Sequence, residues 1–95
     1  MRLQSPHFVV YAGQIPDNAR GALGITVSRR IGNAVARNRV KRRIRECYRR
    51  SLRERLPAGL ALVVIARTGA ATLDFPTLST ELQGAAAKLK EKLAR

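Results

Sequence analysis

The sequence predicts an α+β fold, with a small, mostly antiparallel sheet, a strand–helix–strand crossover and a C-terminal helix, and with the helices on one face of the sheet. Three observations lead to this prediction. Three short runs rich in β-branched and aromatic residues are bounded by turn residues. Two longer segments repeat their apolar residues with a helical period. A length of 95 residues predicts a single domain, residues 1–95, with one modest core.

We expect the strands at about residues 7–12, 22–28 and 60–66. Side chains alternate along a strand, so Phe8 and Val10 should share one face of the first strand, and Val9 and Tyr11 the other. The turn-rich residues 13–21 form a hairpin-length loop, which predicts antiparallel pairing of the first two strands. The third run, LALVVIA, is apolar throughout, as is typical of a strand covered on both faces.

We expect the helices at about residues 34–56 and 75–94. Asn33 is the predicted N-cap of the first helix, and Pro57 and Gly59 should end it. Asp74 and Pro76 predict the start of the second helix. In the first helix, i, i+3, i+4 spacing predicts a buried stripe of Ala36, Val40, Ile44, Cys47, Tyr48 and Leu52.

Positive charge is concentrated in residues 29–55, which hold twelve of the 19 Lys and Arg residues and only two acids. Eleven of these twelve cations are Arg, whose planar guanidinium suits phosphate oxygens, whereas a solvated helix face usually mixes charges of both signs. The sequence pI of about 11.7 points to nucleic acid or an anionic membrane as a partner. The predicted row opposite the apolar stripe is Arg39, Arg42, Arg45, Arg49 and Arg53.

Several classes of protein are disfavoured by what the sequence contains. It has no run of 18 apolar residues and no signal-peptide layout, so we expect a cytoplasmic protein. Its single cysteine, Cys47, excludes an internal disulfide and a Cys-based zinc cluster. His7 has no Cys or His partner at ligand spacing, and no paired carboxylates flank a candidate site. We therefore predict no catalytic residue and no metal site within this chain.

The run from Gly24 to Glu46, GITVSRRIGNAVARNRVKRRIRE, resembles the signature of the bacterial ribonuclease P protein subunit. Its centre, Arg37-Asn38-Arg39 followed by Lys41, Arg42 and Arg45, is similar to the Arg-Asn-Arg motif of that family. The segments FVVY at residues 8–11 and LVVIAR at residues 62–67 also resemble strands of the family. The resemblance extends over roughly residues 3–90.

The resemblance implies a subunit of a ribonucleoprotein endoribonuclease that removes the 5′ leader of precursor tRNA by hydrolysis. It further implies that the chemistry belongs to the catalytic RNA and to Mg²⁺ ions held by that RNA. The residues implied to bind the catalytic RNA are Arg29, Arg30, Arg37, Asn38, Arg39, Lys41, Arg42, Arg45 and Arg49. The residues implied to form a cleft for the leader on the exposed sheet face are Val9, Tyr11, Thr26, Ser28 and Arg67.

The sequence departs from the family pattern in two places. Family members usually carry an amphipathic helix and a short strand ahead of the segment that resembles HFVVY, and we expect that helix to be missing here. A trimmed chain, a misplaced start and a natural short form each explain this. The sheet face would then be uncovered, which predicts weak leader binding and dimerisation or strand exchange through that face. The family also usually has an acid at the position of Ala61.

Other functions fit parts of the sequence. Composition alone agrees equally well with a structural RNA-binding protein of ribosomal type. A basic-region DNA-binding helix would need heptads and a dimer, whereas the apolar stripe breaks at Pro57. A membrane-surface helix would need an exposed apolar face, which the predicted strands are available to cover.

Overall fold

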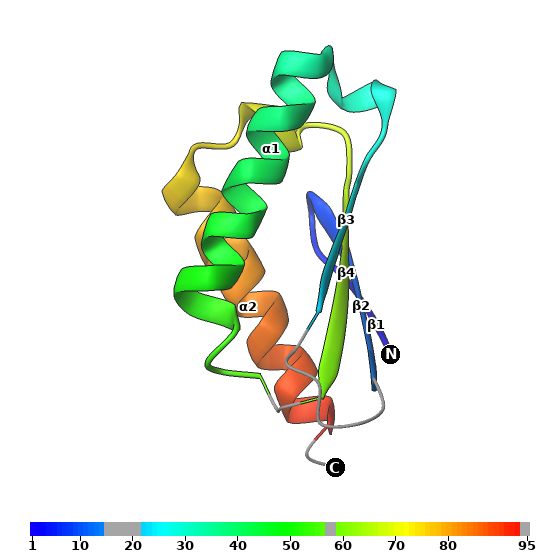
Figure 1. Ribbon diagram of the computed structural model, residues 1–95, viewed down its shortest axis with the longest axis vertical. Coiled ribbons are helices and arrows are strands. Elements are labelled where there is room, and N and C mark those ends of the chain that lie inside the picture. The colour runs from blue at the N-terminus through cyan, green and yellow to red at the C-terminus, as the bar shows by residue number, and fades with distance from the viewer. Residues whose placement is uncertain (15–21, 57–58, 94–95) are drawn as a thin grey trace.

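The structure is a computed structural model that describes residues 1–14, 22–56 and 59–93. Four strands form one sheet, and both α helices lie on the same face of it (Figure 1). The predicted α+β class is confirmed. The elements in chain order are β1 (Arg2–Gln4), β2 (Phe8–Gln14), β3 (Leu23–Val27), the 3-10 helix η1 (Arg29–Ile31), α1 (Ala34–Cys47), the π-helix η2 (Tyr48–Leu52), β4 (Leu60–Ala66), the 3-10 helix η3 (Ala70–Thr72) and α2 (Phe75–Leu93).

The strand order is β1-β2-β4-β3, so the last strand in the sequence lies between β2 and β3. β4 pairs antiparallel with β2, from Phe8 opposite Ala66 to Gln14 opposite Leu60. On its other side β4 pairs parallel with β3. The predicted hairpin between the first two strands is therefore wrong, because the most apolar strand takes the position that is hydrogen-bonded on both sides. Residues 15–21 of the predicted loop lie outside the described residues.

A short strand that the sequence did not predict precedes β2. β1 pairs antiparallel with β2, with Arg2 opposite Tyr11 and Gln4 opposite Val9. The Ser5 N–H donates to the carbonyl of Phe8 at 2.8 Å and closes the turn between the two strands. Three residues with the sequence RLQ carry too little alternation to predict a strand. The short strand that the family resemblance implies ahead of β2 is thus present.

The entry into α1 depends on two adjacent residues. Asn33 is the N-cap, as predicted, because its Oδ1 accepts a hydrogen bond from the N–H of Ala36 at 2.9 Å. Gly32 has φ +151°, and a Cβ there would lie 3.0 Å from the Cβ of Ala36. Glycine is therefore required at position 32 for the chain to turn into the helix.

The end of the first helix differs from the prediction. The α-helix stops at Cys47 and continues as the π-helix η2, in which the N–H of Arg53 donates to the carbonyl of Tyr48 at 2.9 Å. Residues 53–55 form a turn and residue 56 a bend, rather than helix. Pro57 lies outside the described residues, whereas Gly59 has the positive φ of +78° expected where a helix has ended.

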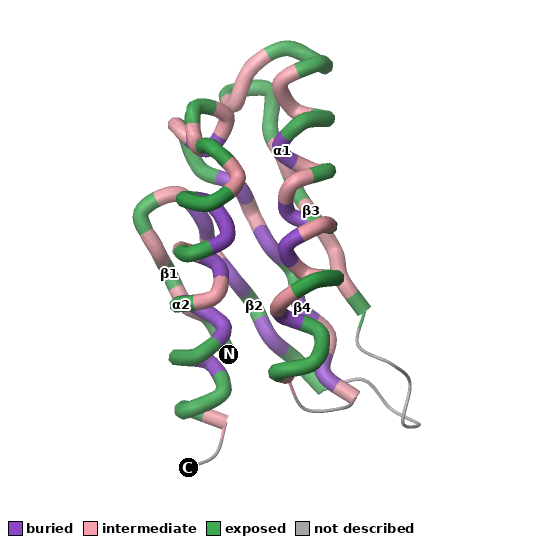
Figure 2. Tube along the Cα trace, turned by 90° about the vertical axis from the view of Figure 1, so that its left-hand side faces the viewer, coloured by how far each residue is buried: buried purple, intermediate pink, exposed green. Residues whose placement is uncertain are grey.

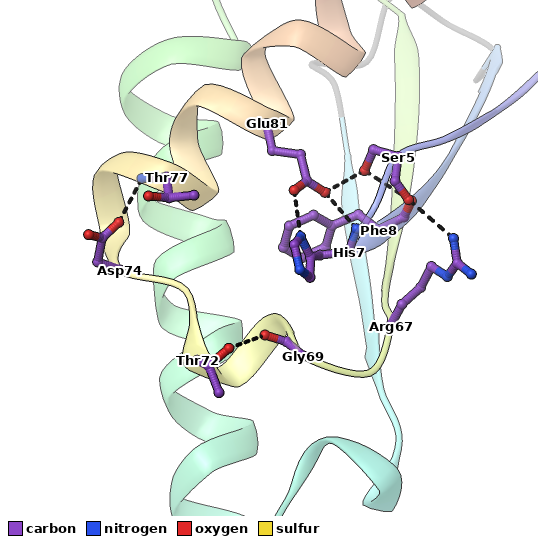
Figure 3. Close-up of polar contacts among 9 residues, drawn as sticks. All are labelled: Ser5, His7, Phe8, Arg67, Gly69, Thr72, Asp74, Thr77 and Glu81. Carbon is purple, nitrogen blue, oxygen red and sulfur yellow. Dashed lines mark hydrogen bonds and ion pairs between the residues drawn. The ribbon is translucent and has the colours of Figure 1, made fainter.

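The start of α2 agrees with the prediction. The N–H of Thr77 donates to Oδ1 of Asp74 at 2.9 Å (Figure 3), and the N–H of Leu78 donates to the Asp74 carbonyl at 3.0 Å. The pKa of the Asp74 carboxyl is lowered, mainly by its hydrogen bonds with Thr77. Asp74 therefore stays ionised and caps the helix. Residue 94, the predicted end of this helix, lies outside the described residues.

The core lies between the sheet and the two helices, as the buried segments on facing sides of these elements show (Figure 2). Phe8 and Val10 on β2 and Val64 on β4 point into it, together with Ile44 of α1. Burial of each such side chain typically contributes about 1.5–3 kcal/mol. Cys47 is buried in this core, as predicted, and burial raises the pKa of its thiol. The helices are thereby fixed to one face and leave the other face of the sheet uncovered.

Candidate nucleic-acid interface

The cation-rich side of α1 faces solvent. Of the nine residues predicted to bind the catalytic RNA, seven are exposed and two, Arg37 and Lys41, are half-buried. The apolar stripe on the other side of the helix is in the core at Val40, Ile44 and Cys47. α1 is thus supported by the protein on one side and free to contact a polyanion on the other. The exposed members are Arg29, Arg30, Asn38, Arg39, Arg42, Arg45 and Arg49.

Two of these arginines lie in a different element from the one expected. The sequence predicts a strand at about residues 22–28, directly before Arg29 and Arg30, and alternation across its end would let at most one of the two reach the cleft side of the sheet. In the structure β3 ends at Val27, and both arginines belong to the 3-10 helix η1, with both exposed. They therefore extend the cationic surface of α1 beyond its N-terminus.

The side chain of Arg37 has an unusual environment. Among the described residues, its Nε is the one buried side-chain nitrogen or oxygen without a hydrogen-bond partner. A buried donor without an acceptor typically costs about 1–3 kcal/mol. Because this Nε is buried, an acceptor from outside the protein could reach it only after the side chain moves. The unpaired nitrogen is therefore a feature of the packing around Arg37 and does not by itself indicate a ligand.

Glu46 organises two further guanidinium groups. Nη2 of Arg49 lies 2.7 Å from Oε2 of Glu46, and Nε of Arg50 lies 2.6 Å from its Oε1. The hydrogen bond from Arg49, followed by the charges of Arg49 and Arg50, lowers the pKa of the Glu46 carboxyl. Glu46 is therefore ionised, and it holds two exposed cations in a fixed relation to the helix.

No helix of the described residues lies on the opposite face of the sheet (Figure 1), which is called the open face here. Strand register places Arg2, Tyr11, Val63 and Gly24 side by side across it. Tyr11 is 41% exposed and Val63 is 40% exposed, which makes them the most accessible large apolar side chains of this face. The next row consists of Gln4, Val9, Ile65 and Thr26.

Most residues predicted for a leader cleft lie on or beside the open face. Val9, Tyr11 and Thr26 are on it, and Ser28 is exposed immediately after β3. Arg67 follows β4, and its Nη1 donates to the carbonyl of Ser5 at 3.2 Å, as Figure 3 shows. Its guanidinium is thus partly engaged with the turn between β1 and β2.

Sequence reasoning missed Arg2 and Gln4 on β1 and Val63 and Ile65 on β4 as members of the open face. The prediction that the run LALVVIA is covered on both faces is wrong, because the two helices cover only one face of β4 (Figure 1) and leave Val63 40% exposed on the other. Ala61, where the family usually has an acid, is half-buried opposite Gly13 at the end of the same face.

Comparison with known proteins decides the family. The family model described as Ribonuclease P matches residues 1–90. The chain belongs to the ribonuclease P protein family. It is 40% identical over 93 residues to the ribonuclease P protein component of a Geobacter species, covering 98% of this chain and 78% of that protein.

Solved ribonuclease P proteins have the same fold. The Staphylococcus aureus protein superposes with a TM-score of 0.83 at 30% identity, covering 95% of this chain and 81% of that chain. The Thermotoga maritima protein, solved in complex with 1-(4-fluorophenyl)-2-thiourea, gives a TM-score of 0.79 at 34% identity, covering 88% of this chain and 80% of that chain. The chain is accordingly a protein subunit of a ribonuclease P endoribonuclease, which works with ribonuclease P RNA.

In this ribonuclease P protein a polar cluster fastens the turn between β1 and β2 to α2 (Figure 3). The carboxylate of Glu81 accepts hydrogen bonds from Ser5 Oγ at 2.6 Å and from the His7 N–H at 2.8 Å, and its Oε1 lies 2.8 Å from His7 Nδ1. Burial raises the pKa of Glu81, but the hydrogen bonds from Ser5 and His7 outweigh burial, so the net shift is downward. The cluster sets the position of β1 and thus the edge of the open face.

Two kinds of site are missing from the described part of this ribonuclease P protein. No three His, Cys, Asp or Glu side chains within residues 1–14, 22–56 and 59–93 gather to hold a metal ion. No helix of the described residues is long and apolar enough to cross a membrane.

Proposed function

We propose that the exposed cations of η1 and α1 bind the catalytic RNA of ribonuclease P, and that the open face binds the 5′ leader of precursor tRNA. The observation that carries this proposal is the separation of two surfaces. A row of exposed guanidinium groups lies on a helix whose other side is in the core, and an uncovered sheet with an accessible aromatic lies beside it. The first surface suits a folded polyanion, and the second suits a single strand.

The open face has the composition expected for an extended strand of nucleotides. Tyr11 offers an aromatic ring for stacking on a base, and Arg2 lies opposite it on the neighbouring strand, where a backbone phosphate could be neutralised. Gly24 and Thr26 place no bulky side chain on the β3 side of this face, so a chain of nucleotides could lie across it. Stacking of one base on an aromatic side chain is typically worth about 1–3 kcal/mol.

We assign the hydrolytic step to the RNA and the Mg²⁺ ions that it holds. The proposed interface, as far as the described residues form it, does not fit an Mg²⁺ site, because it consists mainly of guanidinium groups, which cannot ligate a metal. The protein side chains would bind and orient the two RNAs and neutralise their phosphates. A purely structural ribosomal protein would share the cationic helix, but membership of the ribonuclease P family favours the present proposal.

Cleavage of precursor tRNA by a bacterial ribonuclease P RNA, with and without this chain, tests the proposal. We expect the chain to stimulate cleavage at low Mg²⁺, where phosphate repulsion is least screened. Absence of stimulation at every Mg²⁺ concentration would refute the proposed function. A ribosomal protein of similar size and charge is the control for non-specific neutralisation.

The leader surface has its own test. Tyr11→Ala should weaken binding of a precursor with a leader by about 1–3 kcal/mol, whereas Tyr11→Phe, which keeps the ring, should not. Neither change should alter the affinity of the RNA–protein complex for mature tRNA without a leader. An equal loss for both tRNA forms would show that Tyr11 supports the fold rather than the leader.

A further inference from the structure

The flank of α1 that faces the start of α2 carries a groove that includes residues outside the set predicted from the sequence. The groove has a volume of about 420 Å³ and is lined by Arg42, Arg43, Arg45, Glu46 and Phe75. This volume lies in the range of roughly 300–1,000 Å³ that holds small ligands. Phe75 is the only aromatic side chain among these five residues, and it is the first residue of α2.

The wall formed by Phe75 is held in place by two arginines of the first helix and η2. Arg43 donates from Nη1 to the carbonyl of Leu73, which fixes the backbone just before Phe75. The guanidinium carbon of Arg50 lies 5.8 Å from the centre of the Phe75 ring, within the distance of a cation–π contact. Arg50 is itself held by Glu46, so the ring and the guanidinium are positioned before any ligand arrives.

The charge around the groove is positive, and part of it is not paired with a carboxylate. Its two neighbouring carboxylates already have partners, since Glu46 binds Arg49 and Arg50, and Asp74 caps α2. Among the described residues neither Arg42 nor Arg45 has an ion-pair partner, and both are exposed at the rim of the groove. The groove therefore combines an apolar aromatic wall with two uncompensated guanidinium groups.

We propose that this groove holds one unpaired nucleotide of an RNA, with its base against Phe75 and its phosphates on Arg42 and Arg45. An acidic peptide would satisfy the arginines but would leave the aromatic wall unused, whereas a nucleotide offers both a flat base and a phosphate. Arg42 and Arg45 also belong to the cationic face of α1, so the groove is continuous with the proposed RNA surface. This inference rests on the proposed RNA-binding function of that face.

The test compares Phe75→Leu with Phe75→Tyr in binding to a bacterial ribonuclease P RNA at fixed salt. Leu keeps most of the apolar volume that packs against the core but loses the ring, and Tyr keeps the ring. We expect Phe75→Leu to weaken binding by about tenfold, and Phe75→Tyr to bind as the unmodified protein does. Because every arginine proposed to bind phosphate is kept, the dependence of the RNA-binding constant on salt should be the same for Phe75→Leu as for the unmodified protein.

The folded fraction of each variant, measured by circular dichroism, corrects the affinities for any loss of stability. Unchanged affinity of Phe75→Leu, or equal weakening by Leu and Tyr, would overturn the proposal, since either result leaves no role for the ring against a base. Failure of the unmodified protein to bind the RNA would instead refute the proposed function itself.

Discussion

Arg39 and Arg42 are exposed on α1 and are one helical turn apart, which suits contacts with successive phosphates. If each neutralises one phosphate, the double change Arg39→Ala and Arg42→Ala should weaken RNA binding. It should also reduce the slope of log K against log salt by roughly 0.7–0.9 for each phosphate that is no longer neutralised. The measurement is the affinity for ribonuclease P RNA over a series of salt concentrations.

The matched control for that pair is Lys88→Ala with Lys90→Ala, which removes the same charge from the exposed surface near the C-terminal end of α2. Its salt slope should remain close to that of the unmodified protein. If both double variants reduce the slope equally, the net charge of +13, rather than the helix, determines binding.

Glu81 provides a second prediction for a single residue. Its pKa in the folded protein lies below the ordinary value of 4.5, so the carboxylate stabilises the fold above about pH 4.5, and this contribution is lost as the pH falls through the lowered pKa. Glu81→Gln should reduce the free energy of unfolding by about 1–3 kcal/mol at pH 7, because hydrogen bonds from Ser5 and His7 lose their charged acceptor. Urea unfolding at pH 7 and at pH 3 measures the free energy of unfolding of the unmodified protein and of Glu81→Gln.

The two proteins should converge in stability at the lower pH, where the carboxylate of the unmodified protein becomes protonated. Glu54→Gln is the control, because that side chain is on an exposed turn. A constant difference between Glu81→Gln and the unmodified protein across this pH range would contradict the assignment of the effect to the carboxylate.

At the scale of elements, substitutions at the N-cap of α1 should change the stability of the protein and its RNA binding independently of each other. Asn33→Ala removes the acceptor for the Ala36 N–H and should lower the free energy of unfolding by about 1 kcal/mol. Asn33→Asp keeps the acceptor and should retain the stability, while its negative charge beside the cationic face should weaken RNA binding. Urea unfolding and RNA titration of the same two variants distinguish these effects, and an Asp variant as unstable as the Ala variant would disprove the capping role.

Local periodicity was sufficient to predict that two helices and three of the strands exist, although the first helix ends earlier than predicted. The caps at Asn33 and Asp74 and the alternation of β2 depend on residues close together in sequence, and they are present. The predicted stripe is buried at Val40, Ile44 and Cys47 of α1 and at Leu52 of η2, whereas Ala36 and Tyr48 are only half-buried. The pairing of strands is not local. A short loop favours pairing of the first two strands with each other. In the structure the apolar strand β4 lies between them and is hydrogen-bonded to both. The sequence of the loop does not show that β4 takes this position.

In the candidate site, too, the residues that follow a local pattern were predictable and the contacts between separate elements were not. Helical spacing identifies the arginines that face solvent, and the Arg-Asn-Arg motif indicates their partner. Arg2 and Val63 join Tyr11 only through the order of strands, and Phe75 meets Arg50 only because α2 packs against the first helix. Tyr11 and Val63, like Arg50 and Phe75, are distant in sequence, and the three-residue strand that carries Arg2 is too short to show alternation, so no local pattern marks these contacts.

At the scale of the whole molecule, the net charge of +13 and the open face have opposite effects on self-association. Repulsion between two copies opposes contact at low salt, and it is screened within about 10 Å at 0.1 M salt. We therefore expect any dimer formed through the open face to strengthen as salt increases, whereas RNA binding weakens. Analytical ultracentrifugation over a salt series measures this, with Val63→Lys as the variant that should remain monomeric. A monomer at every salt and protein concentration would contradict the expected dimer.

The central position of β4 has a consequence for biosynthesis. β2 and β3 are both hydrogen-bonded to β4 and not to each other, and β4 begins at Leu60, after α1 is complete. A ribosome therefore releases the arginine-rich helix before the sheet that supports it can close, and closure is a late, long-range event of the kind that slows folding. A nascent chain interrupted before Leu60 would expose a polycationic helix and an unpartnered β3.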